Sequence, residues 1–468
     1  MRMNTSTNSN LAGFFNPKNI AVIGASEKNQ WFANLLENAR KTGFEGKFFP
    51  VNPKAAAVCG IPAVPSIGEL PGTVDFGVIM VNSRLVFSTL QELAARNIKN
   101  VLLISSGFSE SAGEGERLQA EVREFCIGNG ISLVGPNCLG FINVAGRASV
   151  FGGGSVQIDP VPGDIGLVSQ SGASLEVIAT KMFKKGLGIS LMVSSGNEAV
   201  VSFEDCLEYL VDHGSTRVIA AFIEGFRNTP ALRRIAMKAA AKRIPIVAVK
   251  VGGSAKGSAA AMSHTGALAG NDRVAGAFMR QYGIARAGSI EELVETVGIF
   301  SRCSVPKGRG LAVCTLSGGL AGMYADICSS LKINLPDFSP GTVAALKAAL
   351  PEFANPANPL DLTGQGFYFG MENVMRIILD DPNIDVVATL SFPPEKEGDL
   401  YAMHNEYIIK SAASTEKPVI PLTFREMTDF ARKYYRDRGL YFIEHPADGF
   451  RAIAHLLDYV KFLERVGR

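Results

Sequence analysis

The chain has 468 residues, a length that suggests about three domains with buried cores. Its 46 Lys and Arg residues nearly balance 44 Asp and Glu residues, and the formal net charge of +2 gives no reason to expect a nucleic acid or an anionic membrane as a partner. Seven scattered cysteines without a CxxC pair favour reduced thiols in a cytoplasmic protein over a disulfide framework or a zinc site. No apolar run reaches the roughly 18 residues of a membrane span. The polar start, MRMNTSTNSN, lacks the apolar core of a signal peptide and predicts a disordered tail over residues 1–13.

The first predicted domain, residues 14–150, alternates short apolar runs with segments of helix length. Each run is followed by a polar or glycine-bearing turn, which is typical of buried strands in a parallel doubly wound sheet. The sequence therefore predicts a Rossmann-like domain whose turns all lie at one edge of the sheet. The predicted strands are residues 20–23, 47–51, 76–81, 101–104 and 131–134.

The turns of this first domain indicate which ligand it binds. The segment VIGASEKNQ has one glycine, Gly24, where the dinucleotide fingerprint has three, and the second strand leads to Lys54 where a ribose-binding acid is expected. Both features disfavour NAD. A lysine at this place suits a ligand with an additional phosphate, and coenzyme A, with its pyrophosphate and 3′-phosphate, fits that demand. The alternative for Lys54 alone is an ordinary solvated surface lysine.

The second predicted domain, residues 151–306, opens with a strand at 165–168 and a glycine-bearing turn into a helix. Ser171, Gly172 and Ala173 begin that helix. Because a helix N-terminus presents free N–H groups and about half a positive charge, these three residues form a candidate phosphate cradle.

Two ionisable residues follow later strands of the same domain. Glu224 ends the strand 218–223, and His264 follows the strand 246–249 within the small-residue stretch GGSAKGSAAAMSHTGALAG. Both are therefore expected at one edge of the sheet, where a carboxylate can hold an imidazole in one tautomer. The alternatives remain open: a bystander histidine in a flexible glycine loop, and a Glu224 that pairs with Arg227 or caps a turn.

The third predicted domain, residues 307–468, repeats the pattern of the second. Its turn into a helix, at Ser317, Gly318 and Gly319, lies 146 positions after the first cradle. Apolar runs at 386–390 and 419–422 and a closing helix at 448–465 complete a second small α/β domain. If the two domains face each other, two helix N-termini point at one site, an arrangement that stabilises a doubly charged phosphate on a histidine.

The order of motifs along the chain resembles that of the NDP-forming acyl-CoA synthetases, the relatives of succinyl-CoA synthetase, and in particular the α subunits of ADP-forming acetyl-CoA synthetases. This resemblance implies a CoA-binding Rossmann-like domain followed by two flavodoxin-like domains. It also implies that a carboxylate, ATP and CoA give acyl-CoA, ADP and phosphate through an acyl phosphate. The motifs are VIGAS, VNPK, ISSGFSE, GPNCLGFIN, GDIGLVSQSGA, SGNE, IEG, SHTGALAG and NPLDLTG.

The resemblance also implies roles for individual residues. His264 matches the histidine that is phosphorylated, and Glu224 matches the carboxylate that orients it. Residues at the two predicted helix starts match the groups that grip the phosphate: Ser171, Gly172, Ala173, Ser317, Gly318 and Gly319. Residues on segments expected to line the coenzyme A site, with Lys54 as a phosphate contact, are Gly24, Ser26, Lys54, Ser105, Gly107, Asn137 and Cys138.

Two departures from the family pattern qualify this interpretation. The first loop has no further glycine before the helix, and Trp31 stands in that neighbourhood, so the pyrophosphate of CoA is expected to be held differently. The chain also has no GxxxxGK[ST] motif and no room for an ATP-grasp domain, so ATP, ADP and Mg²⁺ are expected on an ATP-grasp β-type partner subunit. A CoA-binding regulatory protein and a nicotinamide enzyme are the alternatives, and the identity of the acyl group stays open.

Overall fold

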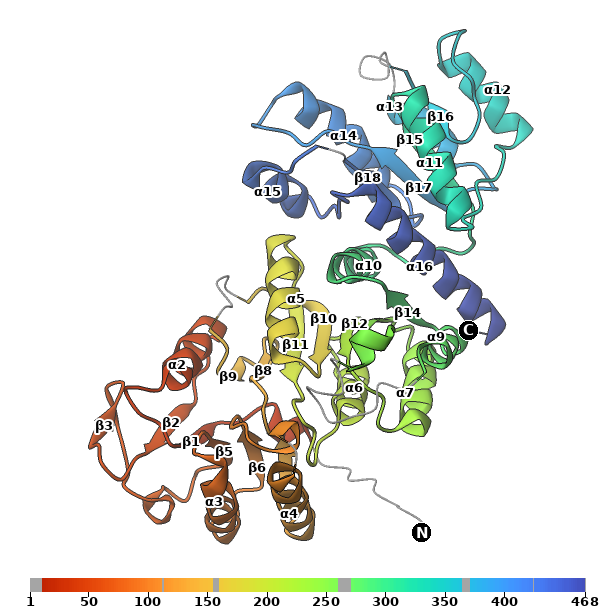
Figure 1. Cartoon of the computed structure of the whole chain (residues 1–468). Helices are drawn as coiled ribbons and strands as arrows, with labels where there is room; N and C mark the ends of the chain where they lie inside the picture. The colour runs from red at the N-terminus through yellow and green to blue at the C-terminus, as the bar shows by residue number, and fades with distance from the viewer. Residues whose placement is uncertain are drawn as a thin grey trace. The chain divides into compact units, whose positions relative to one another are not determined.

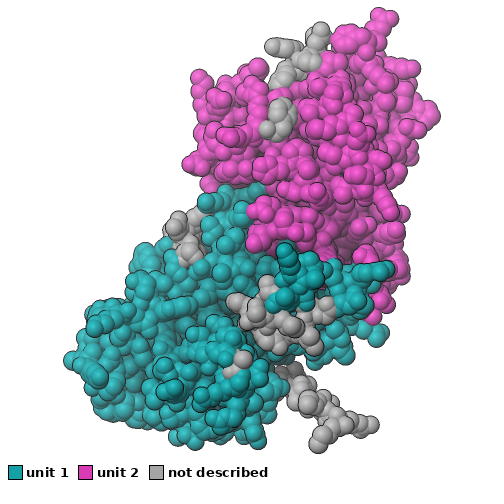
Figure 2. All heavy atoms as spheres, viewed as in Figure 1, with its two compact units in different colours: residues 1–278 teal, residues 279–468 magenta. Residues whose placement is uncertain are grey.

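The computed structural model describes residues 11–111, 113–154, 160–259, 271–363, 371–423 and 425–467. The chain forms two compact units, residues 1–278 and 279–468, shown in different colours in Figure 2 and as a ribbon in Figure 1. The strands of unit 1 contribute to two large sheets, and four strands of unit 2 form another. No helix within the described ranges is long and apolar enough to cross a membrane.

The first sheet of unit 1 is parallel throughout, with the strand order β2-β1-β5-β6-β7. This order and direction confirm the predicted doubly wound fold. Helices α3 and α4 lie side by side against the sheet (Figure 1), and their leucine and valine side chains share one buried cluster with the strands. The strands are β1 (Asn19–Ile23), β2 (Lys47–Val51), β5 (Phe76–Ile79), β6 (Asn100–Leu103) and β7 (Ser132–Val134), with β3 (Ala57–Val58) and β4 (Ile61–Pro62) as a small separate hairpin; the helices are α2 (Gln30–Thr42), α3 (Ser83–Ala95) and α4 (Glu114–Gly128), with short 3₁₀ turns η1 (Ile67–Glu69) and η2 (Ser109–Ser111).

The second sheet of unit 1 contains the strand order β13-β12-β10-β11-β8-β9. Strands β10 to β13 are parallel, as predicted, but the hairpin β8–β9 pairs antiparallel with β11. This hairpin was not predicted: the last strand expected in the first domain is 131–134, and the residues from there to 150 were placed in that domain without further strands. The strands are β8 (Gly140–Asn143), β9 (Ala148–Phe151), β10 (Pro162–Ser169), β11 (Ile189–Ser194), β12 (Val218–Ile223) and β13 (Ile246–Lys250); the helices are α5 (Gly172–Lys184), α6 (Phe203–Asp212), α7 (Thr229–Ala241) and α9 (Asp272–Gln281).

The two sheets of unit 1 are joined by aromatic packing and by an asparagine. Phe14, at the end of the short helix α1 (Leu11–Phe14), packs edge-on against Phe76 of the first sheet at 4.9 Å and lies 5.7 Å from Phe141 of the second. Asn38 of α2 donates a hydrogen bond of 2.9 Å to the carbonyl of Phe151 in β9. Residues 11–13, expected in the disordered tail, therefore form a helix because Leu11 and Phe14 are buried.

The main sheet of unit 2 is also parallel, with the order β16-β15-β17-β18. Helix α16 packs along α10, and a ring contact between Phe300 and Tyr459 at 5.4 Å fixes that pair. The predicted strands and closing helix of the third domain are confirmed. The elements are β14 (Ile284–Ala287), α10 (Ile290–Arg302), β15 (Leu311–Thr315), α11 (Gly318–Ser330), α12 (Pro340–Ala349), β16 (Leu360–Asp361), α13 (Met371–Leu379), β17 (Val386–Leu390), α14 (Leu400–Ala413), β18 (Val419–Leu422), α15 (Asp429–Asp437) and α16 (Pro446–Arg465).

Candidate active site

A cavity of about 240 Å³ lies in unit 1 at the carboxyl ends of the strands. Open α/β sheets place their ligands at this edge, because the turns there carry free backbone groups and functional side chains. Both sheets contribute, and the cavity brings together six of the predicted site residues. Its lining consists of Trp31, Ile104, Ser106, Asn137, Cys138, Leu139, Gln170, Ser171, Gly172, Ala173, Gly196, Asn197 and Glu224.

The N-terminus of helix α5 forms one wall of this cavity. Ser171 is the N-cap, and its hydroxyl accepts a hydrogen bond of 3.3 Å from the backbone N–H of Ser174. The N–H groups of Gly172 and Ala173 lie in the first helical turn, where no intrahelical acceptor exists. A Cβ atom at Gly172 would stand 2.6 Å from Cγ of Leu139, so glycine lets the helix end approach the cavity wall closely. Free N–H groups at a helix start can bind an anion, and phosphate binding here stays a prediction.

The equivalent helix start in unit 2 is α11. Ser317 is its N-cap without a side-chain capping bond, and Ser317, Gly318 and Gly319 are all exposed. A helix therefore begins at the second Ser-Gly motif, 146 residues after the first, as the sequence predicts. That the two helix starts meet at one phosphate stays a prediction.

The turn that carries Glu224 is held by a glutamine amide from the neighbouring strand end. Gln170 Oε1 accepts hydrogen bonds from the backbone N–H groups of Glu224 (2.6 Å) and Gly225 (3.0 Å), while its Nε2 donates to the carbonyl of Gly225 (3.0 Å). Lys250 Nζ, at the end of β13, donates to the carbonyl of Glu224 at 2.9 Å. With its backbone fixed from both sides, the largely buried Glu224 presents its side chain to the cavity.

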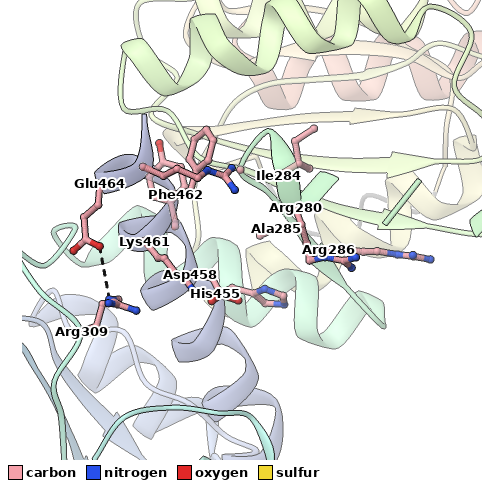
Figure 3. A pocket seen from close by; sticks show the side chains of 13 residues that line it. Arg280, Ile284, Ala285, Arg286, Arg309, His455, Asp458, Lys461, Phe462 and Glu464 are labelled. Carbon is pink, nitrogen blue, oxygen red and sulfur yellow. Dashed lines mark ion pairs between the residues drawn. The ribbon is translucent and has the colours of Figure 1, made fainter. Parts of the chain in front are cut away.

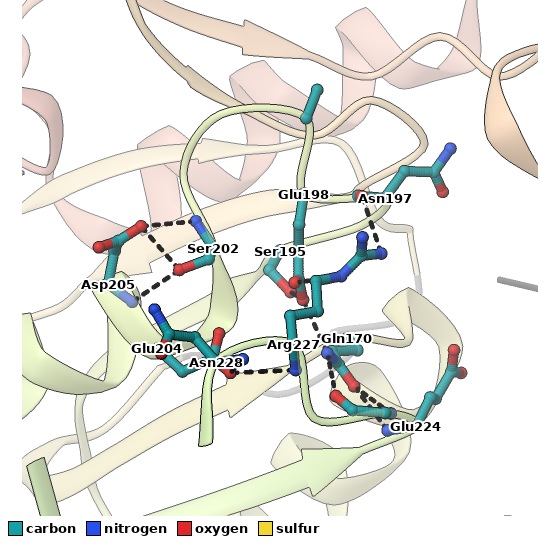
Figure 4. Close-up of polar contacts among 12 residues, drawn as sticks. Gln170, Ser195, Asn197, Glu198, Ser202, Glu204, Asp205, Glu224, Arg227 and Asn228 are labelled. Carbon is teal, nitrogen blue, oxygen red and sulfur yellow. Dashed lines mark hydrogen bonds and ion pairs between the residues drawn. The ribbon is translucent and has the colours of Figure 1, made fainter. Parts of the chain in front are cut away.

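Glu198 lies at the centre of the polar cluster behind this turn (Figure 4). Its Oε1 accepts hydrogen bonds of 2.9 Å from both Gln170 Nε2 and Ser195 Oγ, and its Oε2 is 2.8 Å from Arg227 Nε. Arg227 thus pairs with Glu198. The alternative prediction, that Arg227 pairs with Glu224, is wrong. Complete burial raises the pKa of Glu198 to about 7 although Arg227 opposes the shift.

This raised pKa predicts a pH dependence of stability. Between the ordinary pKa of about 4.3 and the raised value, the folded chain holds a proton that the unfolded chain releases, so the free energy of unfolding falls as the pH rises. We expect the Glu198 contribution to change by on the order of 3 kcal/mol across that window. Chemical denaturation from pH 4.5 to 8 should show this fall in the wild type and a flatter profile in Glu198→Gln.

A matched control for that measurement is Glu372→Gln, because Glu372 is an exposed carboxylate on α13. It should reproduce the wild-type profile. If Glu198→Gln and the wild type instead lose stability in parallel as the pH rises, the titration of Glu198 does not contribute.

The other residues predicted for the coenzyme A site lie at the carboxyl ends of the first sheet, outside the 240 Å³ cavity. Gly24 and Gly107 adopt positive φ angles of 89° and 98°, and a Cβ atom would stand 2.9 Å from Val81 Cγ1 or 3.0 Å from Ser83 Oγ, respectively. Ser105 Oγ donates to the carbonyl of Val81 at 2.6 Å. Glycine at 24 therefore lets its turn pack against Val81, and a side chain at 107 would crowd Ser83. Both turns lie at the edge where open α/β sheets bind their ligands.

Lys54 and Ser26 lie at the same edge. Lys54 is exposed after β2, and its backbone N–H donates to Asn52 Oδ1 at 2.8 Å. The Asn52 side chain in turn donates to the carbonyl of Ala25 at 2.8 Å, next to the half-buried Ser26. Asn52, which the sequence analysis did not single out, therefore ties the turn that bears Lys54 to the first turn of the sheet.

Asn137 and Cys138 contribute differently to the cavity. Asn137 has a φ of 57° and donates from Nδ2 to Asn197 Oδ1 at 3.3 Å. Cys138 is 3% exposed, and burial raises the pKa of its thiol to about 12. Because the thiolate is the reactive form, this burial disfavours Cys138 as a nucleophile.

His264 lies outside the described residues, so its position stays a prediction. Strand β13, which leads toward it, is the parallel neighbour of β12, which leads to Glu224. Gln170, Glu198 and Lys250 are not among the predicted site residues. Gln170 and Glu198 stand inside the motifs VSQSG and SGNE, but their bonds depend on a contact between distant turns that no local pattern reveals.

Comparison with known proteins agrees with this arrangement. The family described as "CoA binding domain" matches residues 18–144, and that described as "Succinyl-CoA ligase like flavodoxin domain" matches residues 162–300. The chain is 32% identical to the α subunit of acetate–CoA ligase [ADP-forming] II from Pyrococcus furiosus, over 96% of this chain and 97% of that subunit.

Longer relatives and solved structures match as well. Acetate–CoA ligase [ADP-forming] I of Archaeoglobus fulgidus is 34% identical over 96% of this chain, which spans only 63% of that protein. The acetyl-coenzyme A synthetase 1 of Ca. Korarchaeum cryptofilum, solved with phosphate and ADP, superposes with a TM-score of 0.86 at 27% identity, over 98% of both chains. The chain therefore belongs to the family of ADP-forming acyl-CoA ligases and corresponds to their α subunits.

Proposed function

We propose that this chain is the α-type subunit of an ADP-forming acyl-CoA ligase that acts through a phosphohistidine on His264. The proposal rests on one observation: the N-terminus of helix α5, Glu224 and Asn137 all line the same cavity. Its relatives with ligase names support an enzyme over a CoA-binding regulatory protein. Domain limits at 14–150, 151–306 and 307–468 belong to the same proposal.

The proposed reaction has three balanced steps. Phosphate and acyl-CoA exchange to give acyl phosphate and CoA; the phosphoryl group then moves to the neutral imidazole of His264 and releases the carboxylate; finally ADP accepts it and becomes ATP. The synthetic direction is the reverse of these steps. Each transfer to or from the imidazole is an in-line displacement on phosphorus.

The residues of this chain have separate tasks in these steps. The free N–H groups of Gly172 and Ala173 stabilise the transferring phosphoryl group, whose negative charge matches the positive end of α5. The carboxylate of Glu224 accepts the N–H of the His264 ring, which leaves the other ring nitrogen free to attack. Gln170 and Lys250 keep that carboxylate in place through its backbone.

Coenzyme A fits the surface formed by the first sheet. The turns at Gly24 and Gly107 both have positive φ angles, and Lys54 offers an exposed cation for a phosphate. The thiol that CoA supplies is the acyl acceptor. The nucleotide and Mg²⁺ belong, in this proposal, to an ATP-grasp partner subunit.

The overall proposal is tested by mixing the chain with an ATP-grasp partner subunit, CoA, ATP and a panel of carboxylates. We expect acyl-CoA and ADP to form in equal amounts with at least one short or aryl acid. A chain that binds acyl-CoA but forms no product with any acid of the panel contradicts the proposal.

The only tryptophan of the chain, Trp31, lines the proposed catalytic cavity and is 39% exposed. We therefore expect acetyl-CoA to quench the intrinsic emission in a saturable way, with the same Kd that calorimetry gives. Trp31→Phe should remove the optical signal and keep calorimetric binding. If acetyl-CoA binds by calorimetry and leaves the emission unchanged, it does not bind in this cavity.

A further inference from the structure

Unit 2 contains a second, larger cavity of about 820 Å³, formed by one face of helix α16, the segment around β14 and the loop before β15 (Figure 3). Its volume lies in the range of about 300–1,000 Å³ that small-molecule sites occupy. It shares no residue with the cavity of unit 1. Its lining consists of Arg280, Gly283, Ile284, Ala285, Arg286, Arg309, His455, Asp458, Tyr459, Lys461, Phe462, Glu464 and Arg465.

The inner part of this cavity is apolar and partly aromatic. Tyr459 and Phe462 are 4% and 5% exposed, and their ring centroids are 6.1 Å apart. Gly283, with a φ of 70°, passes so close to Phe462 that a Cβ atom would stand 2.3 Å from its ring. The buried Ile284 follows directly. Such a surface accommodates a flat, weakly polar ring better than a hydrated ion.

The rim, by contrast, is strongly basic. The lining contains five Lys and Arg side chains and two carboxylates, a local net charge of +3, whereas the whole chain of 468 residues carries +2. In the view of Figure 3, Arg280 and Arg286 lie on one side and Arg309 on the other, with Lys461 between them. A concave surface with this excess of one sign concentrates counter-ions of the opposite sign.

Two of these cations have no neutralising partner among the described residues. Within the ranges that the structure describes, the side chains of Arg280 and Lys461 are exposed and take part in no hydrogen bond or ion pair. Arg309 Nε lies 3.9 Å from Glu464 Oε2, at the outer limit of an ion pair. Arg465 is held by a bond of 2.5 Å to the carbonyl of Gln281 and lies over the Phe462 ring at 5.4 Å.

We propose that this cavity binds a nucleoside phosphate. The phosphates meet Arg280, Arg309 and Lys461, because guanidinium and ammonium groups form the strongest hydrogen bonds with phosphate oxygens. The base lies against Tyr459 and Phe462. Inorganic phosphate would bind the basic rim but leave the apolar inner part empty. A nucleoside phosphate has a charged group for the rim and a flat base for the inner part.

The test is a calorimetric titration of the full chain with ADP, pyrophosphate and adenosine. We expect ADP to bind more tightly than either fragment, and more weakly as salt rises, since exposed charges are screened. Lys461→Glu and Arg309→Glu should each weaken ADP binding about 10-fold or more, as expected for the loss of a charge-assisted hydrogen bond. Lys347→Glu, an exposed lysine on α12 away from the cavity, is the matched control and should bind like the wild type.

Thermal unfolding shows whether each variant is folded, and Trp31 emission separates the two cavities. ADP bound in unit 2 should leave that emission unchanged. Equal ADP binding by the wild type, Lys461→Glu and Arg309→Glu overturns the proposal, as does binding of pyrophosphate as tight as that of ADP. Neither result bears on the ligase reaction, which depends on the cavity of unit 1.

Discussion

Gly172→Asp is expected to lower phosphoryl transfer by at least about 100-fold, in the range found when one donor of an oxyanion site is lost. The new carboxylate would stand at the first position of α5, next to the free N–H groups that face the cavity. It would satisfy those groups itself and repel the phosphate. An aspartate at a helix N-terminus stabilises the helix, so the variant should fold.

Gly172→Ala is the matched control for this variant. Its Cβ atom meets Leu139 in the same way as that of aspartate, so both variants require the same shift of Leu139, but alanine brings no charge. We expect a loss of less than about 10-fold, consistent with local repacking. Activity is measured as phosphate-dependent conversion of acyl-CoA, and acetyl-CoA binding to both variants is measured by calorimetry. If both substitutions lower activity equally, the effect is steric and the helix dipole is not involved.

His264→Asn is expected to abolish turnover, because asparagine has no nitrogen that attacks phosphorus. The exchange between phosphate and acyl-CoA, which precedes the histidine step, should persist and can be followed as acyl phosphate formation. Complete turnover is measured with the ATP-grasp partner subunit. Turnover near the wild-type rate in His264→Asn would require another phosphoryl carrier.

The parallel sheets were predictable because their strands are buried on both faces. Runs such as Ile20–Ile23 and Val218–Ile223 are continuously apolar, and each ends in a polar or glycine-bearing turn, so strand and edge are both visible in the sequence. The hairpin β8–β9 was not visible in the same way. Its first strand follows directly on the motif GPNCL, and its pairing with β11 depends on a contact with a strand that lies about 50 residues later.

Some residues that line the cavity were predictable, because a local backbone pattern in the sequence indicates their position. Ser171 and Gly172 open a helix after a buried strand, a pattern that specifies a helix N-cap and a free helix end. Gln170 directly precedes Ser171 and Gly172, but no backbone feature of this kind indicates its role. Its amide bonds to Glu224, Gly225 and Glu198 link three turns that only the folded chain brings together.

The buried charges were equally beyond prediction from the sequence. Lys250 ends an apolar strand, and its ammonium group is satisfied by the carbonyls of Glu224 and Val251. Glu198 is satisfied by Ser195, Gln170 and Arg227. A charged side chain in a sequence is usually a surface residue, and only the partners that the fold supplies permit its burial.

The central claim, that His264 carries the phosphoryl group, is tested most directly by incubating the chain with radiolabelled phosphate and acetyl-CoA and analysing the protein after denaturation. The account predicts one acid-labile, alkali-stable phosphoryl group per chain in the wild type, located by mass spectrometry on His264, and none in His264→Asn. Equal labelling of the wild type and His264→Asn, or a label that maps to another residue, would contradict it.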